Sequence, residues 1–332
     1  MAHLVEQMAY TNQVPWHGLG RYLDPETPFE DWLEAAGLTY TVRVSDVYYD
    51  IGDGQRDHIV PSRRVLYRDD SNSPLGIVSN RYRIVQPRTV MEFFRSLCDG
   101  DDASVPLATM ETAGVLHSGR RVWALARLSD SLASELGVLP EEERMTPYLL
   151  LTTSYDGTMA TVAQLTYVRV VCNNTLTASL QASIAATERE CDTRVVVPHN
   201  RQFDIHSVRS RMGLTEATLR SNLQTMLRTI QRLAAKPLSD KALRDLYARV
   251  APSEGVAEKL YALAHDAPGQ RTGFARSASG RVTAWGALNA VTYYEDHVRR
   301  SRTADGRMAN AMHSRVKRTA LAYLSTTLPE AA

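Results

Sequence analysis

The sequence predicts an α+β protein, in which an antiparallel sheet with helices on one face is followed by an α-helical C-terminal module. Apolar and polar residues alternate over much of residues 40–166, and this period of two is typical of strands. Beyond about residue 200 the apolar spacing becomes three and four, which is typical of amphipathic helices. We therefore expect an α+β domain over residues 1–200 and a basic helical domain over residues 201–332.

The first predicted element is a helix over Pro28–Ala36. Thr27 and Glu30 fit a capping box at its start, and Gly37 fits the left-handed residue that ends a helix. Three strands should follow over residues 40–51, 58–69 and 75–85, joined by turns. The next helix begins at Gln86-Pro87 and ends before Gly100, and its predicted inward residues are Val90, Phe93, Phe94 and Leu97.

A second group of strands and a helix should complete the sheet domain. Strands are expected over residues 109–118 and 120–128, and two longer ones on either side of Tyr155-Asp156-Gly157, where Asp-Gly suits a tight hairpin. Asn173 or Asn174 would cap the helix after them. In the C-terminal module, Pro237 ends one helix and Ser239 and Ser253 cap the next two. Further helices are expected over residues 283–300 and 308–328.

The net charge of +1 conceals an electrical asymmetry between the two halves of the chain. Residues 1–188 hold 15 Lys and Arg against 24 Asp and Glu, a balance of −9, whereas residues 189–332 hold 23 against 13, a balance of +10. Such asymmetry suggests either a polyanionic partner for the basic half or head-to-tail contact between subunits.

Several classes of function lack their usual sequence signals. The motifs H-E-x-x-H, G-x-S-x-G, Walker A and G-x-G-x-x-G after a strand do not occur, so we predict no catalytic residue, metal or cofactor. Three cysteines without C-x-x-C spacing argue against a disulfide framework. Because the sequence shows neither a long apolar run nor a signal peptide, we expect a cytoplasmic protein with no membrane partner.

The candidate nucleic-acid-binding residues are basic side chains, most of them near the C-terminal end. Seven cations lie within residues 299–318 against the single acid Asp305. Cations of this kind can neutralise phosphates, although a solvated helix face that meets the acidic half of another subunit is the alternative. The candidates are Arg169, Arg194, Arg299, Arg300, Arg315, Lys317 and Arg318.

A second candidate surface lies in the predicted sheet, where tyrosines and arginines are interleaved. Aromatic rings beside cations are what sequence-tolerant single-strand binding uses, although half-buried strand tyrosines are equally common. The tyrosines are Tyr48, Tyr49, Tyr67, Tyr82, Tyr155 and Tyr167, and the arginines are Arg63, Arg64, Arg81, Arg83 and Arg169.

Four stretches, Met1–Gly20, Ser154–Gly157, Arg169–Leu176 and Trp285–Thr292, resemble the phage/plasmid-like protein family, which has domain of unknown function 932. Tyr155 stands where histidine is commoner in that family. The resemblance implies an origin on bacteriophages, prophages or conjugative plasmids. Such elements often encode recombination proteins that anneal single strands, and the Rad52-like ones combine an antiparallel hairpin with helices and form rings. The unit over residues 149–182 is similar in outline.

These observations lead to the prediction of a phage or mobile-element protein that binds and anneals single-stranded DNA in recombination. We expect it to act as a homo-oligomer, such as a ring, beside a phage exonuclease and without a cofactor. One alternative is a protein-interaction factor, such as a phage inhibitor of a host defence or regulatory protein, acting through its acidic half. Another is a DNA-processing nuclease with dispersed carboxylates.

Overall fold

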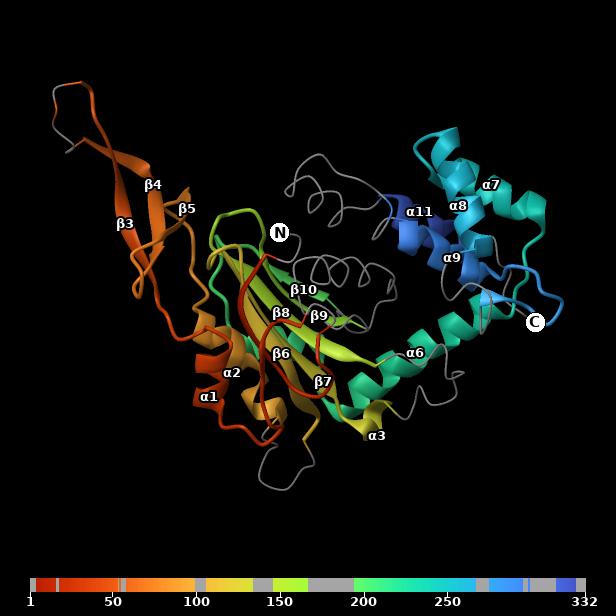
Figure 1. Cartoon of the computed structure of the whole chain (residues 1–332), viewed down its shortest axis with the longest axis horizontal. Helices are drawn as coiled ribbons and strands as arrows, with labels where there is room; N and C mark the ends of the chain where they lie inside the picture. The colour runs from red at the N-terminus through yellow and green to blue at the C-terminus, as the bar shows by residue number, and fades with distance from the viewer. Residues whose placement is uncertain are drawn as a thin grey trace. The chain divides into compact units, whose positions relative to one another are not determined.

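A computed structural model describes residues 4–15, 18–52, 54, 58–98, 106–133, 146–166, 194–266, 275–294, 298 and 315–326. The chain divides into two compact units. The first comprises residues 1–130, 146–176 and 190–216, and the second comprises residues 131–145, 177–189 and 217–332. Each unit is described by itself (Figure 1).

A seven-stranded sheet forms the centre of the first unit (Figure 1). Its strands pair antiparallel except for β1 and β2, which are parallel. The strand order is β10-β9-β8-β7-β6-β1-β2. The bounds are β1 Val5–Tyr10, β2 Arg21–Tyr22, β6 Ala108–Leu116, β7 Arg121–Leu128, β8 Tyr148–Ser154, β9 Thr161–Thr166 and β10 Arg194–Val197. The α+β class and the antiparallel sheet predicted from the sequence are thereby confirmed.

Helix α2, Pro87–Cys98, packs against β6, β7 and β8 of this sheet. The sequence predicted this helix, and Val90, Phe93, Phe94 and Leu97 are all buried as expected. Nearly every residue of β7, β8 and β9 is also buried, so these strands lie in the core of the unit. Side chains at helical spacing on α2 thus supply one wall of that core.

Helix α1, Phe29–Ala35, begins later than predicted. The expected cap by Thr27 is wrong: Pro28 is the N-cap, and no side chain accepts a hydrogen bond there. Gly37 has the predicted positive φ of 72°. The Gln7 amide donates hydrogen bonds to the carbonyls of Glu34 and Ala35 in the last turn of the helix, and the Gly37 N–H also donates to the Glu34 carbonyl. Strand β1 therefore holds the end of α1 through a side chain.

A second sheet has three antiparallel strands in the order β3-β4-β5. These are β3 Val42–Tyr49, β4 His58–Arg68 and β5 Pro74–Ser79. The alternation predicted all three strands, but the third ends at Ser79 and not at residue 85. One face packs against the loop after β8, because Gly76 leaves room for the backbone of that loop. A Cβ on Gly76 would lie 2.6 Å from the Asp156 Cα and 2.9 Å from the Tyr155 oxygen.

The loop between β8 and β9 is longer than the predicted tight hairpin, since it covers residues 155–160. Tyr155 turns into the core and donates a hydrogen bond to the Val85 carbonyl. Asp156 accepts hydrogen bonds from the backbone and the hydroxyl of Thr158. Burial of Tyr155 takes its backbone out of the turn and explains the extra length.

The second unit has a helical core. Leu243, Leu246, Tyr247 and Val250 point inward as predicted, and the Tyr247 hydroxyl donates to the Ala287 carbonyl. Ser239 and Thr283 cap two of its helices. The C-terminal helices are α6 Glu216–Ala234, α7 Asp240–Val250, α8 Glu254–Asp266, α9 Ala284–Tyr293 and α11 Arg315–Thr326. Short helices α3 Asp130–Ala133 and α5 Ile205–Met212 occur earlier in the chain.

Helices within the described ranges are too short or too polar to cross a membrane.

We predict that Gly76→Ala destabilises the first unit by about 1–3 kcal/mol, because the added methyl overlaps the backbone of the loop after β8. Urea denaturation followed by circular dichroism measures the change. Gly255→Ala is the matched control, since nothing lies within 4 Å of its added Cβ on α8. Equal stabilities of Gly76→Ala and the wild type would contradict the packing described here.

Candidate nucleic-acid interface

The three-stranded sheet has one covered face and one open face. Strand register places Val42, Leu66 and Val78 on the covered face, where all three are buried. Residues that alternate with these along each strand point to the other side, which we call the outer face. It consists of Arg43, Ser45, Arg63, Val65, Tyr67, Ile77 and Ser79. Beyond the register irregularity after Asp46, Tyr49 and His58 lie opposite each other at the far end of β3 and β4.

Aromatic and apolar side chains are accessible on the outer face and at the far end of β3. On the outer face Ile77 is 59% exposed and Tyr67 is partly exposed, and beyond the irregularity Tyr49 is 49% exposed. The Tyr49 ring lies 5.4 Å from the His58 ring across the strand pair, at an interplanar angle of 33°. Flat rings at a surface can stack with the bases of a single strand.

Cations lie beside these rings. Arg43 has a side chain that is 60% exposed, and its Nε lies 3.8 Å from a carboxylate oxygen of Asp69, which makes a long ion pair. Arg63 is exposed and forms no ion pair with the carboxylates of the described residues. Arg64 points to the opposite face and lies 3.5 Å from Asp46. Arg63 is therefore the cation of this face that is most available to a phosphate.

The predicted tyrosines have divergent roles. Tyr155 is fully buried and Tyr82 is half-buried, with its hydroxyl donating to the Ser154 carbonyl, so neither can stack with a base. Burial raises the pKa of both phenols. Tyr48 lies with Ile59 on the side opposite Tyr49. Tyr167 is outside the described residues.

His199 contacts two other segments of the first unit, the one that follows β5 and the loop between β8 and β9. Its ring stacks on Tyr82 with centroids 4.1 Å apart. Nδ1 lies 3.0 Å from the Arg83 carbonyl, and Nε2 lies 3.1 Å from the Met159 carbonyl. A neutral imidazole has one N–H, so only the protonated ring can donate to both oxygens. Burial opposes protonation and lowers the pKa of His199, while the two carbonyls and Asp156 partly offset that effect.

The seven basic candidates are not brought together by the described part of the structure. Arg169, Arg299 and Arg300 lie outside the described residues. Helix α11 contains Arg315, Lys317 and Arg318, but the structure describes only the backbone at these three positions. Arg194 is half-buried on β10, and this burial lowers the pKa of its guanidinium. Their roles in binding remain predictions.

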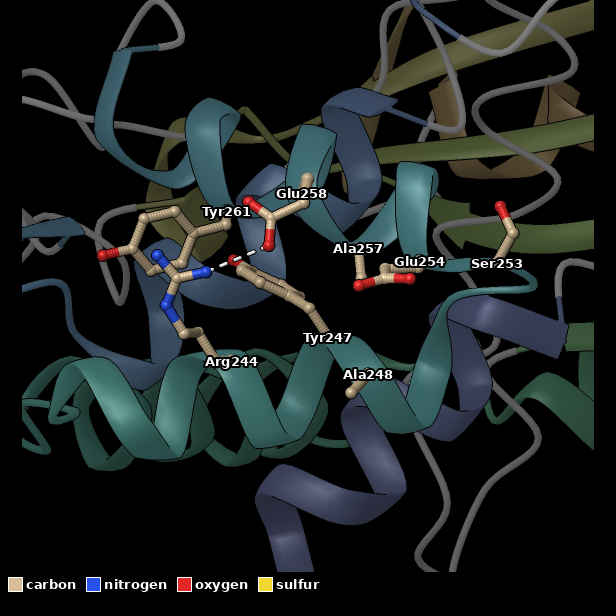
Figure 2. A pocket seen from close by; sticks show the side chains of 8 residues that line it. All are labelled: Arg244, Tyr247, Ala248, Ser253, Glu254, Ala257, Glu258 and Tyr261. Atoms are coloured by element: carbon tan, nitrogen blue, oxygen red, sulfur yellow. Dashed lines mark hydrogen bonds and ion pairs between the residues drawn. The ribbon is translucent and has the colours of Figure 1, made fainter.

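A pocket of about 350 Å³ lies between α7 and α8 in the second unit (Figure 2). Arg244 lies across the Tyr261 ring, 4.0 Å from its centre, and forms a 3.0 Å ion pair with Glu258. Glu254 adds a second carboxylate to the lining. Because the arginine is already paired and the acids would repel phosphate, this pocket suits a polyanion less well than the outer face.

Sequence reasoning missed Arg43 as part of the outer face, and it missed the contacts of His199. Alternation along β3, which pairs Arg43 with Tyr67 of β4, was the signal for Arg43. His199 carried no comparable signal, because its partners lie far away in the sequence. Within the described ranges, no group of three His, Cys, Asp or Glu residues could hold a metal ion.

Residues 74–318 match the family described as a domain of unknown function (DUF932). The chain belongs to this family. The match begins at β5 and extends into α11, so it contains the central sheet from β6 onward and the described C-terminal helices. No curated protein and no solved structure matches the chain. The family assignment agrees with the resemblance seen in the sequence.

We predict that the stability of the first unit falls as the pH drops below about 6.5. The folded state lowers the pKa of His199, so the unfolded state binds the proton more tightly and gains population on acidification. Urea denaturation between pH 8 and pH 5, about the span of histidine titration, measures this dependence. His199→Gln should have a shallower pH dependence, and identical slopes in the two proteins would contradict the assignment to His199.

Proposed function

We propose that this protein binds single-stranded DNA and anneals complementary strands as a homo-oligomer. The observation that carries the proposal is the outer face of the β3-β4-β5 sheet, where Tyr67 and Ile77 are accessible beside Arg43 and Arg63. The origin on a phage or plasmid that the sequence resemblance implies, and a place in the host cytoplasm, belong to the same proposal.

The chemistry of the outer face suits a flexible strand whose bases are unpaired. Stacking on tyrosine does not depend on base identity, because every base has a π-face. Arg43 and Arg63 would contact the phosphates, and the two contacts would hold the backbone along the strands of the sheet. Binding should consequently tolerate any sequence and weaken as salt increases.

Annealing needs two phosphate backbones to approach each other without strong repulsion. The basic cluster around residues 299–318 would supply the additional cations for this step. Two or more copies of the chain would bring two bound strands together. In this scheme the sheet captures the bases and the C-terminal cations reduce the repulsion between backbones.

Tyr67→Ala should weaken binding of a labelled oligonucleotide by about 5- to 150-fold, as expected for the loss of one base stack worth about 1–3 kcal/mol. Fluorescence anisotropy at low salt measures the affinity. Tyr22→Ala is the matched control, because Tyr22 is 56% exposed on β2 but lies outside the outer face. A wild-type protein with no affinity for single strands would overturn the proposed function.

Arg63→Ala should make binding less sensitive to salt, reducing the slope of log affinity against log salt by about 0.7 for one lost contact with a single strand. The same anisotropy assay over a salt series measures the slope. Arg88→Ala removes an equal charge and serves as the control, since Arg88 is held by Glu30 and Glu92 on α1 and α2. Equal slopes for Arg63→Ala and the wild type would remove Arg63 from the interface.

A further inference from the structure

At one edge of the three-stranded sheet, a side chain makes the backbone hydrogen bonds that a neighbouring strand would otherwise make. Gln86 accepts a 2.9 Å hydrogen bond from the Val42 N–H and donates a 3.1 Å bond to the Val42 carbonyl. A neighbouring antiparallel strand exchanges the same two bonds with a residue opposite it. The Gln86 side chain thus satisfies the backbone N–H and carbonyl of Val42, the first residue of β3 whose backbone groups point away from β4.

The next outward-facing residues are Val44 and Asp46. Thr41 accepts a hydrogen bond from the Asp69 N–H, so residues 41, 43 and 45 direct their backbone groups toward β4. Residues 42, 44 and 46 must then direct theirs away from it. Figure 1 shows β3 at the outer edge of the sheet, and no described residue bonds to the outward backbone groups of Val44 or Asp46.

This edge has only part of the usual protection against pairing. Val44 is 45% exposed, and β3 contains neither proline nor lysine, although Arg43 and Asp46 are charged. The register irregularity after Asp46 ends the straight part of the strand. Among the described residues, no strand pairs with the outward side of the short segment centred on Ser45, so another extended strand can bond to it.

We propose that β3 pairs antiparallel with β3 of a second copy of this chain, with Ser45 opposite Ser45. In this register Val44 of each copy lies opposite Asp46 of the other, and each such pair exchanges two hydrogen bonds. Centring the pair on Val44 would place Asp46 opposite Val42, whose backbone Gln86 already occupies. Centring it on Asp46 would place two carboxylates opposite each other, which is unfavourable.

The pairing gives the self-association in the proposed function a defined surface. A two-fold axis through an antiparallel strand pair is perpendicular to the sheet, so both outer faces point to the same side. Arg43, Arg63 and Tyr67 of two copies would then line one continuous surface. Insofar as this surface carries nucleic acid, the inference rests on the proposed function; the pairing itself is tested without nucleic acid.

Ser45→Cys provides the sharpest test, because residues opposite each other without mutual hydrogen bonds have Cα atoms about 4.5 Å apart, within disulfide range. Mild oxidation of the full chain should yield a disulfide-linked dimer on a non-reducing gel. Ser79→Cys, exposed on β5, and the wild type with its native cysteines are the controls. If Ser45→Cys forms no more dimer than Ser79→Cys, the proposed register is wrong.

Val44→Asp tests the pairing independently of oxidation, since it sets a carboxylate opposite Asp46 of the second copy. Sedimentation over a range of concentrations should show weaker self-association for Val44→Asp than for Ile77→Asp, a control with the same charge change at an exposed position of the outer face. A wild-type chain that stays monomeric at high concentration, or equal association of the two variants, would overturn the proposal. Failure here leaves the anisotropy result untouched, so the two proposals are distinguishable.

Discussion

The open face of the three-stranded sheet depends on how closely β5 approaches the loop after β8. Gly76 has no side chain at the point where the backbone of Asp156 passes, and the Tyr155 hydroxyl holds the same loop to the Val85 carbonyl. Arg68 strengthens this side of the sheet by lying over the Tyr40 ring and pairing with Glu6 and Asp70. Because one face of the β3-β4-β5 sheet makes these contacts, only the outer face is open to solvent along its length.

Because one face of the sheet is packed and the other is exposed, the tyrosines near it have two different roles. The rings of Tyr155 and Tyr82 pack against neighbouring residues, and their hydroxyls donate hydrogen bonds to backbone carbonyls. These contacts fix the position of the sheet. Tyr67 belongs to the outer face of the sheet and remains partly exposed. The difference follows from position: Tyr82 and Tyr155 lie in the segments after β5 and β8, whereas Tyr67 lies within β4 with its side chain on the outer side.

The β3 edge and the outer face have complementary roles in the proposed pair of chains. Backbone groups at Val44 and Asp46 offer directional bonds to another strand, while the outer face offers rings and guanidinium groups to a polyanion. Pairing two edges would extend the face without covering it. In the proposed pairing, the charge difference between the two halves of the chain would add a less directional attraction between copies.

Alternation and helical spacing by themselves determined the α+β class, the strands β3 to β8 and the inward residues of α2 and α7, because local periodicity reports which side of an element is buried. The sequence also determined the family and the uneven distribution of charge. Only the tertiary structure decided which tyrosines are accessible, how long the loop at Tyr155 is, and that His199 bonds to Arg83 and Met159. Those outcomes depend on contacts between segments far apart in the chain, and no local pattern encodes them.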